Sequence, residues 1–435
     1  MSKVAIIGSG AMGLAAAYHA AKAGHEVTLF ESDPGPGGMA AHFDFDGLSI
    51  EKFYHFVCKT DAPTFEMLEE LGISDKMRWV DTKMAYYIDG TIHPWGGPFA
   101  LLRFPLMSFW QKFRYAISVF RQTKKANFDD LEHMSAREWI VRDCGQTTYD
   151  LLWRRLLELK FYEYADNISA AWIATRVKRI GKSRKSMLQE TLGYIDGGTQ
   201  TLVTSLIEAI KAKGGTLHLN APVAEVTSEN GHVTGLRVGD VHHTFDHVIS
   251  TVPTPLIRRM VPGLTAAEHD KYDAITNIGV VCLLFKLRKK VSENFWLNII
   301  DDGIEIPGIV EFSNLRPTPD TVVYVPYYMP VTHPKWSKDN QAFLDEAFGY
   351  LKTLNPDLSE DDVMSSIAAR LTHAQPVCEP GFAQKIPPVQ TSIEGLQVAD
   401  TCFYYPEDRG IAESLRLGRD MADAIDHNID HEAAK

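Results

Sequence analysis

Short apolar runs and a helical stretch alternate at the start of the chain. Residues 4–7 (VAII) are all apolar, which is typical of a buried parallel strand. A glycine-rich turn separates them from residues 11–23, whose pattern is helical, and residues 27–30 form a second apolar run. This order predicts that a β–α–β unit opens the chain.

Beyond residue 38 the chain is aromatic and irregular, and it becomes regular again at residue 61. Residues 61–71 carry an apolar stripe at helical spacing. Residues 84–88 and 91–93 flank Asp89-Gly90, which is a strong hairpin signal. Residues 98–190 have mostly helical periodicity.

Strand and helix patterns return in two later blocks. The first block has a helix at 200–213 and strands at 216–219, 223–226 and 248–252. The second has a strand at 396–399 and a helix from 411 to about 427. We expect the stretch between them, 256–389, to be irregular.

The pattern therefore predicts an α/β protein with two interleaved domains. The nucleotide-binding domain is expected from residues 1–85, 190–255 and 390–430, which are separate in the sequence. Residues 86–189 and 256–389 are expected to form a second, α+β domain that binds the substrate.

Composition narrows the class of protein. The chain has 435 residues, 45% of them hydrophobic, so it can build more than one core. The net charge of −12 gives no support for a nucleic-acid partner. The five cysteines are scattered without a C-x-x-C pair, which favours free thiols in a reducing compartment. With a strand beginning at residue 4 and no long apolar run, we expect a cytoplasmic protein without a signal peptide.

The first turn carries the clearest chemical signal. Gly8, Gly10 and Gly13 follow the G-x-G-x-x-G pattern, in which the glycines allow a tight turn, close approach to a pyrophosphate and close helix packing. Ala11 and Met12 would begin the helix whose N–H groups face the phosphates. Glu31 ends the second strand, where a carboxylate binds the adenosine ribose. These residues predict a dinucleotide site but leave the dinucleotide open.

Several later segments resemble one flavoprotein superfamily. A second diglycine, Gly37-Gly38, follows Glu31, and residues 194–206, 220–226, 246–253 and 395–418 resemble, in order, segments of the FAD-dependent amine oxidase and protoporphyrinogen oxidase superfamily. Within it, EKFYHFV (51–57) and residues 156–172 resemble the branch near UDP-galactopyranose mutase.

The resemblance implies a GR2-type, Rossmann-like FAD-binding domain with an interleaved substrate domain. It implies non-covalent FAD, since no cysteine stands in an attachment pattern. The implied cofactor-binding residues are Gly8, Gly10, Ala11, Met12, Gly13, Glu31, Ser32, Gly38, Met39, His55, Val223, Thr251, Asp400, Arg409, Gly410 and Ile411.

The chain departs from the superfamily pattern at two positions. Met39 stands where many members have an arginine that contacts the pyrophosphate, so that charge must be neutralised elsewhere. Tyr162 stands where the branch usually has glycine, and we expect it to narrow the site.

Three residues are candidates for catalysis. His55 lies in an aromatic stretch that the resemblance places beside the flavin, where an imidazole can move a proton or simply pack. Arg409 precedes the last helix and can stabilise charge at the flavin, or form a surface ion pair with Glu407 or Asp408. Lys160 ends a leucine-rich stretch, and its amine can extend to solvent or enter the cavity.

Other side chains keep two interpretations. Arg176 and Arg179 can bind an anion or lie on a helix surface, and Asp400 can bind a ribityl hydroxyl or cap a turn. Four tyrosines can line an aromatic or sugar site or pack in the core: Tyr327, Tyr328, Tyr404 and Tyr405. His242 and His243 are adjacent on a predicted strand and point to opposite faces, so we predict no metal.

Residues 98–125 combine large apolar side chains with basic ones and contain no acidic residue. Such a composition suits a segment that lies on a membrane surface or contacts a lipid-linked substrate. It also suits a helical subdomain that faces its own core. We favour the second interpretation, because amphipathic helices usually face their own core, and keep the first open. The sequence gives no oligomeric state.

Three functions are compatible with these observations. The first is an FAD-dependent oxidoreductase that passes a hydride from a small organic, sugar-type or lipid-linked substrate to flavin N5. The second is a redox-neutral, flavin-dependent sugar mutase. The third is a non-enzymatic escort-type protein, which the complete glycine set and Glu31 argue against.

Overall fold

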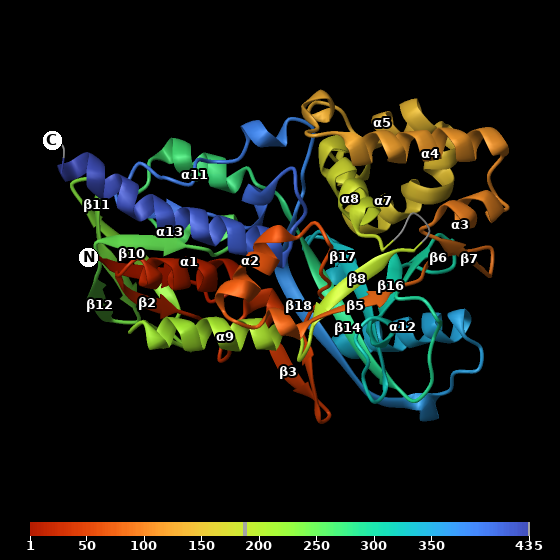
Figure 1. Cartoon of the computed structure of the whole chain (residues 1–435), viewed down its shortest axis with the longest axis horizontal. Helices are drawn as coiled ribbons and strands as arrows, with labels where there is room; N and C mark the ends of the chain where they lie inside the picture. The colour runs from red at the N-terminus through yellow and green to blue at the C-terminus, as the bar shows by residue number, and fades with distance from the viewer. Residues whose placement is uncertain (186–188, 434–435) are drawn as a thin grey trace.

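A five-stranded parallel sheet organises the half of the molecule that contains both termini (Figure 1). The computed structural model describes residues 1–185 and 189–433. The strands lie in the order β19 (Leu396–Val398), β13 (His247–Ser250), β1 (Lys3–Ile7), β2 (Glu26–Phe30) and β9 (Thr216–His218). Three separate stretches of chain thus contribute to one sheet. The predicted domain boundaries themselves stay a prediction.

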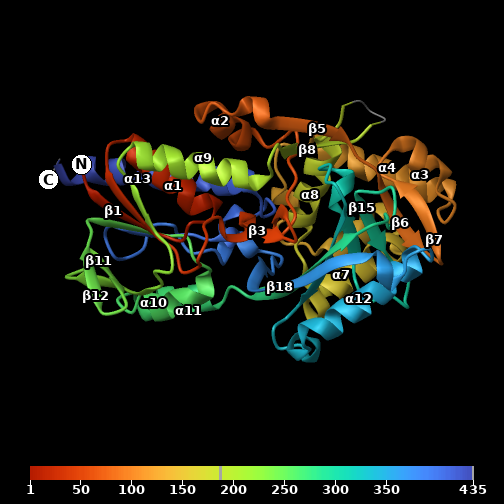
Figure 2. The ribbon, with the colours of Figure 1, turned by 90° about the horizontal axis from the view of Figure 1, so that it is seen from below.

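The two faces of this sheet are covered differently (Figure 2). Val4 and Ile6 point into a core with helices α1 (Ala11–Lys22), α9 (Thr199–Ala212) and α13 (Ile411–Ala433). Ala5 and Ile7 point into a second core on the opposite face. That face is covered by the antiparallel sheet β10 (Val223–Glu229), β11 (His232–Val238) and β12 (Val241–Thr244), with α10 (Ile257–Met260) and α11 (Ala266–Asp273).

A seven-stranded mixed sheet organises the other half. Its order is β18 (Val363–Pro376), β14 (Asn277–Leu287), β17 (Thr321–Met329), β16 (Gly308–Glu311), β15 (Trp296–Ile299), β6 (Met84–Ile88) and β7 (Thr91–Trp95). Only the pair β15–β6 is parallel within this described sheet. Helix α12 (Asn340–Leu354) covers one face and buries Phe343 and Leu351.

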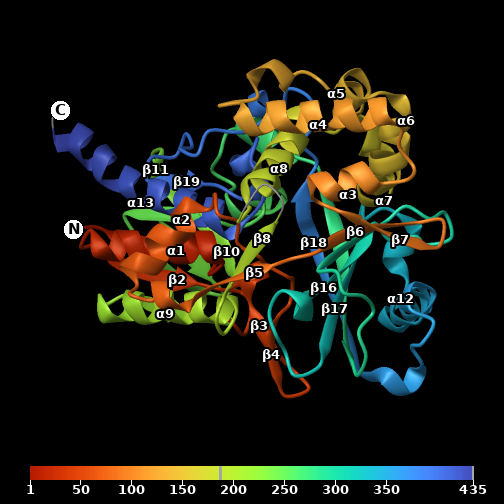
Figure 3. The same cartoon turned by 45° about the vertical axis from the view of Figure 1, so that its right-hand side comes forward.

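A helical lobe lies beside this sheet, far from the termini (Figure 3). Ser108 and Ser135 form capping boxes that start two of its helices. The lobe comprises α3 (Pro98–Arg103), α4 (Phe109–Lys124), α5 (Ala136–Cys144), α6 (Gln146–Tyr149), a π-helical turn (Asp150–Arg154), α7 (Arg155–Phe161) and α8 (Ala170–Lys182). The other strands and α-helices are β3 (His42–Phe45), β4 (Leu48–Glu51), α2 (Ala62–Glu70), β5 (Met77–Asp81) and β8 (Thr191–Ile195). Of these, α2 buries Met67 and Leu68 in the core with α1, α9 and α13.

The opening β–α–β unit, the Asp89-Gly90 hairpin and the last helix are confirmed, but two expectations of irregular chain were wrong. The stretch after residue 38 contains the β3–β4 hairpin, whose Asp46-Gly47 turn has positive φ at both residues. The same signal predicted the later hairpin correctly.

Residues 256–389 contain the long strands β14, β17 and β18. Every residue of β17 is buried, and so is every residue of β14 except the first, so neither strand shows the alternation that marks a half-buried strand. Pro326 also argued against a strand. It is accommodated because the pairing of β17 with β16 ends at Tyr324, before Pro326.

Candidate functional site

The glycine turn after β1 has the geometry that a dinucleotide needs. Gly8 has a φ of +96°, and a Cβ on Gly13 would lie 1.9 Å from the Gly8 carbonyl oxygen, so helix α1 packs directly on the turn. A Cβ on Gly10 would meet nothing within 4 Å, because this backbone faces a cavity. The turn therefore leaves room for a phosphate at the N-terminus of α1.

One cavity of about 1750 Å³ extends from this turn to the helical lobe. All but one of the predicted site residues line it; Gly13 lies behind the turn. Those that line it are Gly8, Gly10, Ala11, Met12, Glu31, Ser32, Gly38, Met39, His55, Lys160, Val223, Thr251, Asp400, Arg409, Gly410 and Ile411. Segments far apart in the sequence thus meet around a single space, and the residues present fit a dinucleotide cofactor.

Glu31 is fixed at the end of β2 before any ligand binds. Its Oε2 accepts hydrogen bonds from the Ser9 backbone N–H (2.8 Å) and hydroxyl (2.7 Å). Its Oε1 accepts one from the Asp33 backbone N–H (3.0 Å). A carboxylate oriented in this way is suited to ribose hydroxyls and repels an additional phosphate.

Asp400 has the capping role that the sequence left open. Its carboxylate accepts hydrogen bonds from the backbone N–H groups of Thr254 (2.7 Å) and Cys402 (2.8 Å). These hydrogen bonds join the turn after β13 to the segment before α13. Asp400 also lines the cavity, so its predicted contact with a ribityl hydroxyl stays a prediction.

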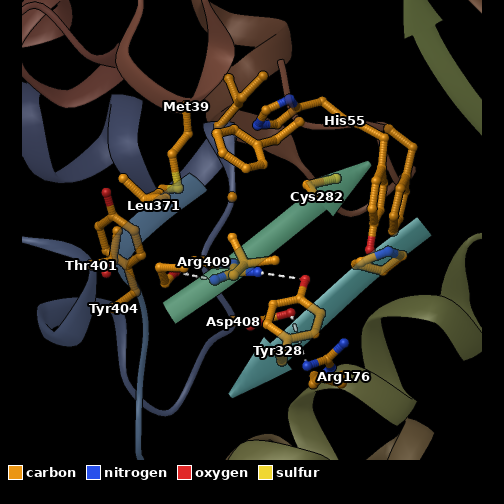
Figure 4. Close-up of a pocket in the computed structure, with 18 of the residues that line it drawn as sticks. Met39, His55, Arg176, Cys282, Tyr328, Leu371, Thr401, Tyr404, Asp408 and Arg409 are labelled. Carbon is orange, nitrogen blue, oxygen red and sulfur yellow. Dashed lines mark hydrogen bonds and ion pairs between the residues drawn. The ribbon is translucent and has the colours of Figure 1, made fainter. Parts of the chain in front are cut away.

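His55 and Arg409 lie in the same part of the cavity (Figure 4). The Nδ1 atom of His55 is buried without a hydrogen-bond partner among the described residues. Burial lowers the pKa of this imidazole, and Arg409 adds to the effect. His55 is therefore neutral at neutral pH and has an unused polar atom available for a ligand.

Arg409 is held by two strands of the seven-stranded sheet. It donates to the Tyr328 hydroxyl on β17 (2.9 Å) and to the Ala374 carbonyl oxygen on β18. Among the described residues it forms no ion pair with Glu407 or Asp408, so the surface ion pair considered for it is not what the structure shows. Its guanidinium instead adds positive charge to the cavity wall beside the N-terminus of α13.

Lys160 lines the cavity, so the alternative in which its amine extends away to bulk solvent is wrong. Its Nζ lies 4.8 Å from the centre of the Tyr328 ring and 5.2 Å from that of Trp172. Arg176 forms an ion pair with Asp408 (3.4 Å). Arg179 donates two hydrogen bonds to the Asp61 carboxylate (2.9 and 2.7 Å), which uses its charge for structure.

The expectation that Tyr162 narrows the site was wrong. Its φ of +51° lies in the region that favours glycine. The ring packs on His333 at 4.4 Å, outside the main cavity. Tyr328 and Tyr404 line the cavity, whereas Tyr327 packs in the core against Phe343.

Sequence reasoning missed the cavity wall formed by the seven-stranded sheet. Cys282 on β14 and Leu371 on β18 face the cavity together with Tyr328 (Figure 4). Tyr328 was a candidate for the site by its residue type, but because these strands were not predicted, no signal pointed to Cys282 or Leu371. Burial raises the pKa of the Cys282 thiol to about 12, so this thiol stays protonated at neutral pH.

The other end of the cavity reaches α3 and α4. Leu101, Ala116, Val119 and Phe120 line it there. Phe120 is also 63% exposed to solvent, so the cavity reaches the surface beside this ring. No helix among residues 1–185 and 189–433 is long and apolar enough to cross a membrane, and these residues contain no group of three or more potential metal ligands.

Comparison with known proteins agrees with this geometry. The model of the family of flavin-containing amine oxidoreductases matches residues 13–388. The 15-cis-phytoene desaturase of Synechococcus elongatus is 24% identical over 318 residues, which is 67% of this chain and 66% of the desaturase. The zeta-carotene desaturase of Zea mays is 26% identical over 360 residues, covering 73% of this chain and 61% of that protein. The match thus spans less than two thirds of each desaturase.

Solved structures show the same fold at low identity. A putative protoporphyrinogen oxidase from Exiguobacterium sp. superposes with a TM-score of 0.75 at 17% identity, covering 98% of this chain and 99% of that one. Reduced UDP-galactopyranose mutase superposes with a TM-score of 0.74 at 16% identity, covering 98% and 94%. Both neighbours belong to the superfamily that the sequence motifs resemble.

Proposed function

Because the chain belongs to the family of flavin-containing amine oxidoreductases, we propose that it is an FAD-dependent oxidoreductase whose substrate is apolar or amphiphilic. The observation that carries this proposal is the continuous cavity from the glycine turn to α4. Its nucleotide end has the ribose carboxylate and the phosphate turn. Its other end is walled mainly by aromatic and aliphatic side chains.

Bound FAD supplies a hydride acceptor in this site. The chain's own residues position the substrate and hold protons. His55 is neutral and has a free ring nitrogen, so it can take a proton from a substrate group as a C–H bond breaks. The apolar walls exclude water from the reacting atoms.

The charges of the cavity argue against small cationic amines as substrates. Lys160, Arg176 and Arg409 line its substrate part together with Asp408, whose carboxylate pairs with Arg176. A protonated amine would meet net repulsion there. We therefore favour a neutral or anionic substrate with a long apolar part.

Anaerobic mixing with candidate substrates tests this proposal. We expect bleaching of the oxidised flavin band by an apolar or amphiphilic compound from a panel of polyenes, porphyrinogens, lipid-linked sugars and alkylamines. Bleaching by small alkylamines alone would contradict the proposed substrate class. A matched His55→Gln variant should keep the flavin and slow bleaching by about a hundredfold if the imidazole moves the proton.

We also propose that α3 and α4 lie on an anionic bilayer, from which the substrate enters. Seven large apolar side chains in this region are exposed, and Arg103, Arg114, Arg121 and Lys124 are exposed among them. The seven are Phe99, Leu102, Leu106, Phe109, Trp110, Phe113 and Phe120. Aromatic side chains mixed with basic ones suit the interface of a bilayer that carries acidic lipids. The cavity comes to the surface in the same region, beside Phe120.

A further inference from the structure

Three cationic side chains meet in the substrate part of the cavity. Lys160 comes from α7, Arg176 from α8 and Arg409 from the segment before α13. Two rings connect them: Trp172 lies 5.2 Å from Lys160 Nζ and 4.8 Å from the Arg176 guanidinium. Tyr328 lies 4.8 Å from Lys160 Nζ and 5.5 Å from the Arg409 guanidinium. The three charges therefore share one aromatic wall.

Lys160 is the member of this group whose N–H hydrogen-bond donors have no acceptor among the described residues. Three aromatic rings lie near its amine, the third being Phe161 at 5.3 Å. No hydrogen bond or ion pair of this amine occurs within the described part of the chain. Rings stabilise an ammonium ion but accept no conventional hydrogen bond, so up to three N–H donors remain for a ligand.

The surrounding charges do not balance. Asp408 is the carboxylate of the group, and its Oδ2 pairs with Arg176 at 3.4 Å while its Oδ1 has no partner among described residues. Arg409 donates only to neutral oxygens. The neighbouring Cys378 thiol is protonated, because burial raises its pKa. The negative charge of Asp408 thus faces two guanidinium ions and the Lys160 amine (Figure 4 shows Arg176, Asp408 and Arg409).

We propose that Lys160 and Arg176 bind a phosphate ester at the polar end of the substrate, whose apolar part extends toward α4. This proposal rests on the proposed function, since it assumes that the cavity beyond the flavin holds the substrate. A phosphate supplies negative charge that balances the cationic side chains, and its oxygens accept hydrogen bonds from the free N–H groups of Lys160. The apolar path to α4 then accommodates a chain attached to that phosphate.

Binding is coupled to a proton. Burial lowers the pKa of Lys160 well below its ordinary value, and Arg176 and Arg409 lower it further, while Asp408 opposes them. This amine therefore gives up its proton more easily than a lysine in solvent. An anion beside it favours the ammonium form, so the site takes up a proton from solvent when the anion binds.

Calorimetry on the flavin-loaded chain tests the site with three probes: decyl phosphate, decanol and inorganic phosphate. We expect decyl phosphate to bind about ten- to a hundredfold more tightly than either other probe, because it satisfies both the cations and the apolar path. Tight binding of inorganic phosphate alone would identify a free phosphate as the ligand and overturn the amphiphile. Equal binding of decanol would show that the cations play no part.

Variants separate the role of Lys160 from general charge. Lys160→Met should weaken decyl phosphate binding by about tenfold or more, whereas Lys182→Met, on the exposed surface of α8, should leave it unchanged. Lys160→Arg should retain binding. Decyl sulfate, whose charge does not titrate, should cause proton uptake in the wild type and none in Lys160→Arg when measured in buffers of different ionisation enthalpy.

The outcomes distinguish this site from the proposed function. If the wild-type chain binds FAD and substrate bleaches its flavin, but Lys160→Met binds decyl phosphate as tightly as the wild type does, the anion site is refuted and the proposed function stands. A chain that binds no flavin refutes the proposed function, whereas calorimetry with the same probes still reports on Lys160. Equal proton uptake in the wild type and Lys160→Arg would also refute the site.

Discussion

Single glycines decide whether the N-terminal turn folds and whether it admits a nucleotide. Gly13 and Gly10 have different surroundings, although both belong to one motif. The first position is filled by the Gly8 carbonyl group, and the second opens on the cavity. The two requirements can therefore be separated by substitution.

We expect Gly13→Ala to destabilise the fold by about 2 kcal/mol or more, since its Cβ would overlap the Gly8 carbonyl oxygen. The free energy of unfolding of Gly10→Val should stay within about 1 kcal/mol of the wild-type value. This variant should bind FAD at least about tenfold more weakly, because the valine side chain occupies the space of the phosphates. Denaturant unfolding and flavin fluorescence titration measure the two effects. A Gly10→Val variant that keeps full flavin affinity would show that the pyrophosphate lies elsewhere.

Glu51 is a buried charge that holds the β3–β4 hairpin against α9. Its carboxylate accepts from the Thr199 N–H (3.1 Å) and from Arg316 (3.0 Å), and His42 lies 3.4 Å away. Although burial opposes ionisation, His42 and Arg316 lower its pKa to about 2. A depressed pKa stabilises the folded state above the ordinary pKa near 4.5, and this contribution is lost as pH falls toward about 2.

Glu51→Gln should therefore lower the free energy of unfolding by about 3 kcal/mol at neutral pH, with the deficit shrinking below a pH of about 4.5. Urea unfolding across this range measures it. The control Glu225→Gln, at a partly exposed carboxylate that pairs with Arg237 on a surface strand, should change stability by less than about 1 kcal/mol at any pH. A deficit that stays constant as pH falls would exclude the ionised carboxylate as its source.

At the scale of elements, α4 has two apolar sides with different partners. Tyr115 packs inward on Trp95, whereas Phe109 and Trp110 are 66% and 69% exposed. A helix that only covered its own core would place such rings inside. The exposed side is thus available to a bilayer.

We expect the wild-type chain to float with vesicles that contain phosphatidylglycerol, and to float less at high salt, because basic side chains accompany the rings. Phe109→Ser with Trp110→Ser should reduce the bound fraction by about tenfold or more. Val241→Ser, which removes a side chain 58% exposed on β12, is the control and should leave flotation unchanged. If the wild-type chain does not float with anionic vesicles or with neutral ones, this surface is not a membrane contact.

For the whole molecule, the sequence predicted the parallel sheet better than the substrate half. The glycine turn, the acidic strand end and the final helix have local signals, and the residues that they predicted line one cavity. Strands β14 and β17 have no local signal, because a strand buried on both faces lacks alternation. The cationic group around Lys160 could not be foreseen as a unit, since its members come from segments that only tertiary packing brings together.

The cofactor of the purified chain tests the central claim most directly. The account predicts a yellow protein that releases about one FAD per chain on denaturation without proteolysis, as expected if the site holds one dinucleotide without a covalent bond. The released flavin is identified by its absorbance and by chromatography against FAD and FMN. A colourless chain that takes up no FAD when it is supplied, while remaining folded, would contradict the account.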